Sequence, residues 1–105
     1  MGYTLYSYPE KFGLTVVAEL DFGDEPYTFD KRIVWKDREN KLWTARDSGC
    51  SCPEPFEDMG LDDLEPLNID FIVDEVHSEL QSKYCQPDPG ACVEFYNKIR
   101  EELQT

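Results

Sequence analysis

The chain has 105 residues, which is enough for one domain and too few for two domains with separate cores. It carries 23 Asp and Glu against 10 Lys and Arg, and a protein of net charge −13 is repelled by nucleic-acid duplexes and anionic membrane surfaces. Hydrophobic residues make up 40% and aromatic residues 13%, which excludes an intrinsically disordered chain. We therefore expect a single folded domain over residues 1–105.

The segment from residue 14 to residue 46 has the alternation of apolar and polar residues that is typical of half-buried strands. In the first strand the apolar side comprises Leu14, Val16, Ala18, Leu20 and Phe22. Residues 29–36 alternate in the same way, and residues 41–46 are expected to form a third strand that carries Leu42, Trp43 and Ala45; polar turn residues separate the three runs. The spacing predicts an antiparallel β-meander within residues 14–46. A segment containing Tyr3, Tyr6 and Tyr8 could add an edge strand.

The next segment, residues 47–67, is rich in Pro, Gly and Cys and shows no periodicity. We expect a long loop laid across one edge of the sheet, with a helical turn near Asp62 and Asp63. Loops of this length in compact domains are usually functional or held by specific contacts.

Two amphipathic helices are predicted in the last third of the chain, over residues 68–85 and 89–103. Asn68 is a favourable N-cap for the first helix, and Pro89 is favourable in the first turn of the second. The apolar stripe of the first helix comprises Ile69, Ile72, Val73, Val76, Leu80 and Tyr84, and that of the second comprises Cys92, Phe95, Tyr96, Ile99 and Leu103. The sequence therefore predicts an α+β fold, in which a small antiparallel meander packs against a C-terminal helical hairpin.

The charge is unevenly distributed along the chain. Ten acidic residues lie between Glu54 and Glu79 with no Lys or Arg among them, whereas six of the ten basic residues lie between Lys31 and Arg46. One interpretation is a solvated acidic face, and another is a surface that meets a basic partner. In the second interpretation the expected partner-binding residues are Asp62, Asp63, Glu65, Asp70 and Asp74. Mimicry of nucleic acid by these carboxylates is a special case.

The four cysteines are compatible with three different states. Cys50 and Cys52 lie in the predicted loop, and Cys85 and Cys92 bracket the turn between the two helices. Together they could hold one structural Zn²⁺ and clamp the loop, although the spacing is not that of the common zinc knuckle. The cysteines could instead remain ordinary thiols, with Cys92 packed as a small hydrophobe, or Cys85 and Cys92 could form a disulfide.

The sequence contains no motif that predicts catalysis. Its six glycines are scattered and form no phosphate-binding loop, and its one histidine, His77, lies on a predicted helix face. A thiol enzyme using Cys50 or Cys52 with His77 is conceivable, but we expect no catalytic residues. Trp35 and Trp43 are expected to be core or sheet-face residues. The chain shows no secretory signal and no bilayer-spanning apolar run, so we expect a soluble intracellular protein.

Residues 43–58, with the core Asp-Ser-Gly-Cys-Ser-Cys-Pro-Glu-Pro-Phe-Glu, are followed by Asp62-Asp63-Leu64. This segment resembles a group of small proteins encoded by bacteriophages of actinobacteria. The resemblance implies a phage accessory protein that acts in the host cytoplasm by binding another molecule, and it supplies no catalytic residue.

The leading interpretation is a non-enzymatic phage accessory protein that binds a basic surface of a host or phage macromolecule. A structural or assembly module clamped by zinc and an inhibitor that mimics nucleic acid are the competing interpretations.

Overall fold

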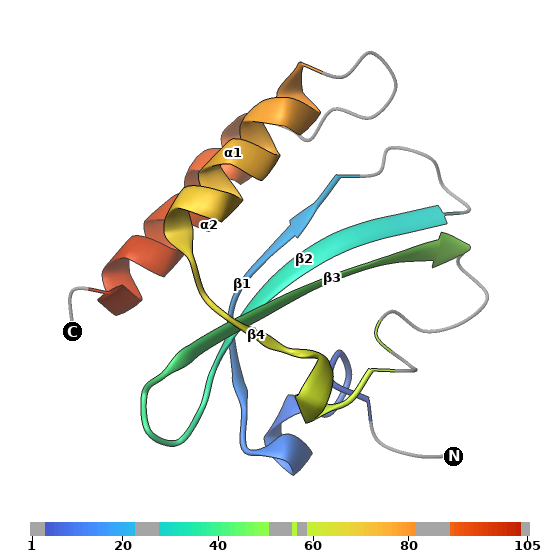
Figure 1. Ribbon diagram of the computed structural model, residues 1–105, viewed down its shortest axis with the longest axis vertical. Coiled ribbons are helices and arrows are strands. Elements are labelled where there is room, and N and C mark those ends of the chain that lie inside the picture. The colour runs from blue at the N-terminus through green and yellow to red at the C-terminus, as the bar shows by residue number, and fades with distance from the viewer. Residues whose placement is uncertain (1–3, 23–27, 51–55, 57–58, 82–88, 104–105) are drawn as a thin grey trace.

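The computed structural model describes residues 4–22, 28–50, 56, 59–81 and 89–103. The elements are η1 (Pro9–Phe12), β1 (Thr15–Asp21), β2 (Thr28–Lys36), β3 (Leu42–Cys50), η2 (Leu61–Asp63), β4 (Glu65–Pro66), α1 (Ile69–Leu80) and α2 (Pro89–Leu103), where η denotes a 3-10 helix. The four strands form one antiparallel sheet in the order β1-β2-β3-β4 (Figure 1). The predicted α+β class, a β-meander packed against C-terminal helices, is confirmed.

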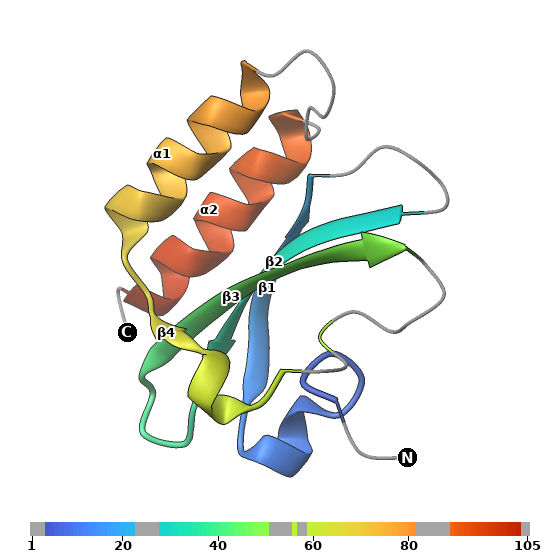
Figure 2. The same cartoon turned by 45° about the vertical axis from the view of Figure 1, so that its right-hand side comes forward.

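Both helices cover one face of the sheet and lie side by side (Figure 2). Their apolar stripes meet the helix-facing side chains of β1 and β2 in one core. This core comprises Ala18, Leu20, Phe22, Val34, Ile72, Val76, Cys92, Phe95 and Ile99. The three- and four-residue spacing seen in the sequence therefore identified the buried centres of both stripes, whereas Val73 and Leu103, which it also placed there, are 39% and 56% exposed. Tyr84 of the first stripe lies outside the described residues.

A second core lies on the opposite face of the sheet. It comprises Leu5, Leu14, Ile33, Trp35, Ala45, Phe56 and Leu64. Trp35 is fully buried, donates its indole Nε1–H to the carbonyl of Leu5 (3.3 Å) and packs edge-on against Phe56, with ring centroids 5.4 Å apart. The segment before β1 thus covers this face. Edge-strand formation around Tyr6 and Tyr8 is a wrong prediction, because Tyr6 lies in a turn and Tyr8 is the N-cap of η1, while Tyr3 lies outside the described residues.

The expected single apolar side of β1 is also wrong at its start. The pairing with β2 shifts between Val16 and Ala18, so β1 contains a β-bulge. The extra residue at a bulge reverses which of the following side chains point to each face of the sheet. Leu14 therefore packs in the second core, whereas Ala18 and Leu20 pack against the helices.

Two predicted boundaries need correction. The predicted loop over 47–67 begins later, because β3 continues to Cys50, and it contains η2 and β4. The short β4 pairs with Trp43 and Thr44 of β3. The first helix ends at Leu80 instead of residue 85. Gln81 is its C-cap, and residues 82–85 of the predicted helix lie outside the described residues.

The turn between β2 and β3 is organised by Asp37. Its carboxylate accepts hydrogen bonds from the indole Nε1 of Trp43 (3.0 Å) and from the backbone N–H groups of Glu39 (2.8 Å) and Lys41 (2.9 Å). The bond from Trp43, followed by that from Lys41, holds the pKa of Asp37 below its usual value.

This lowered pKa predicts a pH dependence of the β2–β3 turn. A carboxyl group with a depressed folded-state pKa contributes stability above its unfolded pKa, and the contribution is lost as pH falls through the folded value. We expect the Trp43 indole N–H resonance to shift on acidification in the wild type, as Asp37 becomes protonated. In Asp37→Asn this transition should be absent. An identical titration in both proteins would contradict the assignment.

Candidate functional site

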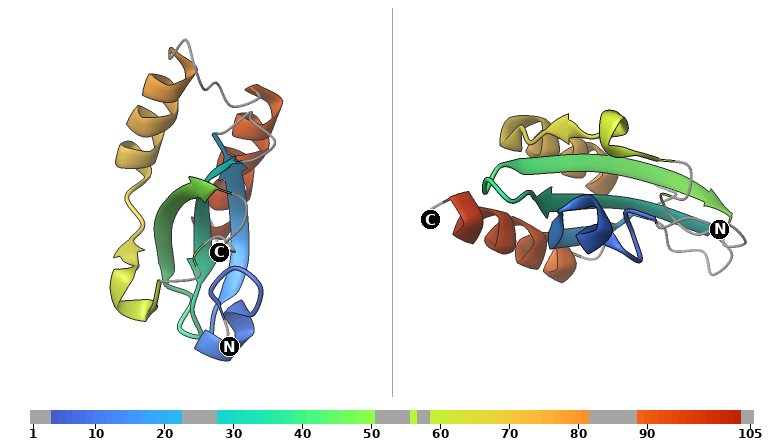
Figure 3. Two further views of the ribbon diagram at one scale, coloured as in Figure 1. Left: turned by 90° about the vertical axis from the view of Figure 1, so that its right-hand side faces the viewer. Right: turned by 90° about the horizontal axis from the view of Figure 1, so that it is seen from below.

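The five carboxylates expected to bind a partner lie along one continuous stretch of chain at an edge of the sheet. We call this set, Asp62, Asp63, Glu65, Asp70 and Asp74, the acidic strip. It runs from η2 through β4 into the first half of α1, and Figure 3 (right) shows η2 and β4 alongside β3. All five residues are exposed. In the described part of the chain none of them forms an ion pair with Lys or Arg.

Local capping fixes the backbone of the acidic strip. The Asp63 side chain accepts a hydrogen bond from the N–H of Gly60 (2.8 Å) and closes η2. Asn68 caps α1 as predicted, because its side chain accepts hydrogen bonds from the N–H groups of Asp70 (3.0 Å) and Phe71 (3.3 Å). Asp70 then lies in the first turn of α1, where the helix dipole stabilises a negative charge.

Not every described carboxylate of the acidic segment, residues 54–79, is directed outward. Glu54, Glu57 and Asp58 lie outside the described residues. Glu75 and Glu79 turn toward the sheet, where both bind arginines. The outward charge of α1 is therefore confined to Asp70 and Asp74.

The inward carboxylates neutralise two arginines that face each other across the strands. Arg32 on β2 is the register partner of Arg46 on β3, and two like charges in this position repel each other. Glu75 binds the guanidinium of Arg32 with both carboxylate oxygens, at 2.8 Å for Nη2–Oε2, and Arg32 Nη1 donates to Thr44 Oγ1 (3.1 Å). The side chains of Arg32 and Glu75 are only 6% and 14% exposed.

Arg46 is held by carboxylates from both the sheet and α1. It donates to Asp30 from Nε (2.7 Å) and Nη2 (2.6 Å), and to Glu79 from Nη2 (3.0 Å). Hydrogen bonding to Asp30 raises the pKa of the Arg46 guanidinium above its usual value. Because this charge network joins α1 to the sheet and its charges are mutually satisfied, we assign it a structural role.

An exposed aromatic residue interrupts the acidic face of α1. Phe71 is 53% exposed, and its ring lies over Arg32 with 5.6 Å between the guanidinium carbon and the ring centroid. Val73 is 39% exposed. Sequence periodicity placed Val73 on the buried stripe and gave no role to Phe71. Both residues add apolar surface on the flanks of the helix face that carries Asp70 and Asp74.

The predicted cysteine site is only partly within the described residues. Cys50 is the last residue of β3, whereas Cys52 and Cys85 lie outside them. Cys92 is 4% exposed in the core beneath the helices. Among the described residues there is no group of three or more His, Cys, Asp or Glu side chains arranged to bind a metal. The four-cysteine zinc site stays a prediction.

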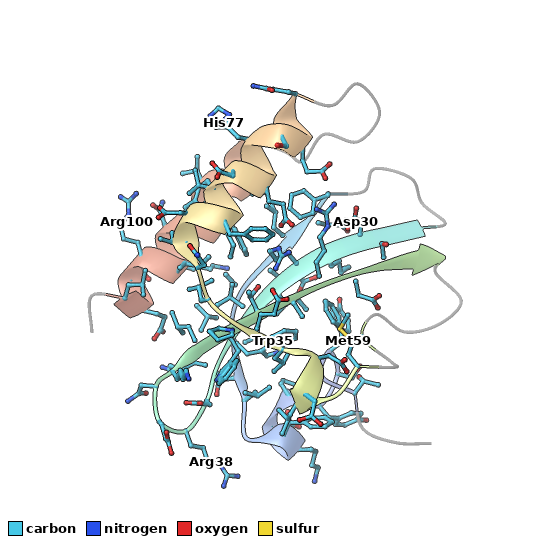
Figure 4. The ribbon with its side chains drawn as sticks, in the orientation of Figure 1. Asp30, Trp35, Arg38, Met59, His77 and Arg100 are labelled. Carbon is cyan, nitrogen blue, oxygen red and sulfur yellow. The ribbon has the colours of Figure 1, made fainter. Side chains whose placement is uncertain are left out.

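The thiol-enzyme alternative paired His77 with Cys50 or Cys52, and Cys52 lies outside the described residues. His77 projects away from the sheet on the outer side of α1, as Arg100 does on α2 (Figure 4). Cys92 is in contrast buried between the helices and the sheet. No helix in the described ranges is long and apolar enough to span a bilayer.

The fold and its charged edge define a small α+β protein with a four-stranded meander, two C-terminal helices and an exposed acidic strip. A domain family of unknown function, DUF7574, matches residues 3–104, and the chain belongs to this family. Searches among curated proteins and among solved structures found no match.

Proposed function

We propose that this protein is a non-enzymatic phage accessory protein that binds a basic surface of a host or phage protein through the acidic strip. The observation that carries the proposal is the division of the acidic side chains into two sets. The first set forms ion pairs with Arg32 and Arg46 and comprises Asp30, Glu75 and Glu79. The second set is the acidic strip, which is exposed and has no basic partner in the described ranges. Exposed carboxylates without a basic partner accelerate the encounter with a protein surface of positive charge.

The surroundings of the strip support the same proposal. Protein interfaces combine an apolar centre with a polar rim. Phe71 and Val73 supply partly exposed apolar surface beside Asp70 and Asp74. The bidentate Arg32–Glu75 pair beneath Phe71 holds this part of α1 against the sheet, so little ordering is needed on binding. The phage origin and action in the host cytoplasm rest on the sequence resemblance alone.

Charge reversal provides the test. The triple variant Asp62→Lys, Asp70→Lys and Asp74→Lys should slow association with the captured partner by about tenfold or more at low salt, because electrostatic steering is lost. Asp63 is left intact since it closes η2. Capture from an actinobacterial lysate at low and high salt with mass spectrometry identifies the partner, and biolayer interferometry gives the association rate.

The matched control reverses Glu10, Glu94 and Glu101, which are exposed acids outside the strip. It changes the net charge equally and should slow association much less. Both triple variants should keep a melting temperature close to that of the wild type, because exposed substitutions change stability little. Equal association rates for the strip variant and the wild type at low salt would contradict the proposal. Displacement of DNA or RNA from the partner would identify the special case of nucleic-acid mimicry.

A further inference from the structure

A pocket of about 320 Å³ opens beside η2, between η1 and the β2–β3 turn. It is lined by Phe12, Leu14, Asp37, Trp43, Leu61 and Leu64. Five of these six side chains are apolar or aromatic. The sixth, Asp37, has both carboxylate oxygens occupied, by backbone N–H groups of Glu39 and Lys41 and by the indole N–H of Trp43. The pocket therefore offers an apolar surface to a ligand.

The two sides of this pocket differ in charge. Leu61 is 50% exposed at the mouth and is followed directly by Asp62 and Asp63, while Leu64 is followed by Glu65. Asp62 and Asp63 of the acidic strip thus belong to η2, the element that contributes Leu61 to the pocket wall. On the other side an adjoining hollow, which shares Phe12, Asp37 and Leu61 with the pocket, is lined by basic Lys11 and Arg38 as well as Glu39.

We propose that this pocket receives a large apolar side chain from a basic segment of the partner. This inference rests on the proposed function. The apolar lining favours insertion of an apolar side chain, and the carboxylates on η2 complement Lys or Arg residues that flank it in the segment. Because Arg38 lies on the opposite side, the cationic groups of the segment point over η2. A buried anchor side chain in a pocket commonly carries much of the binding energy of an interface, and the rim around it is polar.

Three short peptides test the inference by ¹⁵N NMR titration of the full chain. The first has one tryptophan flanked on each side by two lysines, the second has serine in place of tryptophan, and the third keeps tryptophan but has glutamates as flanks. The first peptide should bind about tenfold more tightly than the second, equivalent to about 1.4 kcal/mol. It should shift the Trp43 indole N–H and the signal of Leu64, and the third should not bind.

A pocket variant separates this inference from the proposed function. In Leu61→Ser the preference for the tryptophan peptide should disappear, while salt-sensitive binding of the lysine flanks persists. Equal binding of the first two peptides to the wild type, with shifts confined to the strip, would overturn the pocket inference and leave the proposed function standing. Absence of salt-sensitive binding by both lysine peptides would contradict the proposed function and this inference with it. Binding of the glutamate peptide would overturn the assigned charge preference.

Discussion

Replacing Glu75 by alanine is expected to lower the free energy of unfolding by about 3–5 kcal/mol, the usual effect of removing one member of a buried ion pair. Glu75 holds Arg32 with both oxygens and also contacts Arg46 Nη1 (3.3 Å). Without it, the guanidinium of Arg32 stays buried opposite Arg46 with no carboxylate on it. Urea denaturation followed by circular dichroism measures the loss.

The Lys36–Glu102 pair provides the control, because its side chains are 30% and 29% exposed. Glu102→Ala should cost about 1 kcal/mol or less. A second variant, Arg32→Met with Glu75→Met, should recover most of the stability, since apolar residues replace a buried pair at little cost. A loss below about 1 kcal/mol in Glu75→Ala would show that the pair does not hold α1 to the sheet.

Phe56→Ala is expected to destabilise the protein by about 3–5 kcal/mol through the second core. Phe56 is fully buried against Trp35, and the ring of Tyr6 stacks on it at a centroid distance of 6.4 Å. Alanine leaves a cavity there while keeping the hydrogen bond from the backbone N–H of Phe56 to Asp47 (2.8 Å). The same denaturation experiment measures the effect, and tryptophan emission should shift to longer wavelength as water reaches Trp35.

Phe71→Ala is the matched control for the same side chain at a half-exposed position. It should cost about 1 kcal/mol or less, chiefly through the lost contact with Arg32. If both alanine variants lost similar stability, the second core would not contribute as argued.

Several features of the fold could be predicted because they depend on neighbouring residues. The strand segments of β2 and β3, the Asn68 cap and Pro89 at the start of α2 follow from local signals, and the structure places them as expected. The half-buried character expected of β2 is wrong, because residues 32–35 are buried on both faces of the sheet. The sequence contained no local signal that predicted the second core. Phe56 lies in a Pro-rich stretch without periodicity. Its burial depends on contact with Trp35, which lies 21 positions earlier in the chain.

The sequence by itself determined the net charge, the acidic stretch and the identity of the main strands and helices, because composition and short-range periodicity decide these. Tertiary structure alone decided which carboxylates remain available. Asp74 and Glu75 are adjacent in the chain, yet Asp74 is exposed and Glu75 binds Arg32. The orientation of α1 on the sheet separates them, since successive helical residues point about 100° apart and only one can face the arginines of β2 and β3.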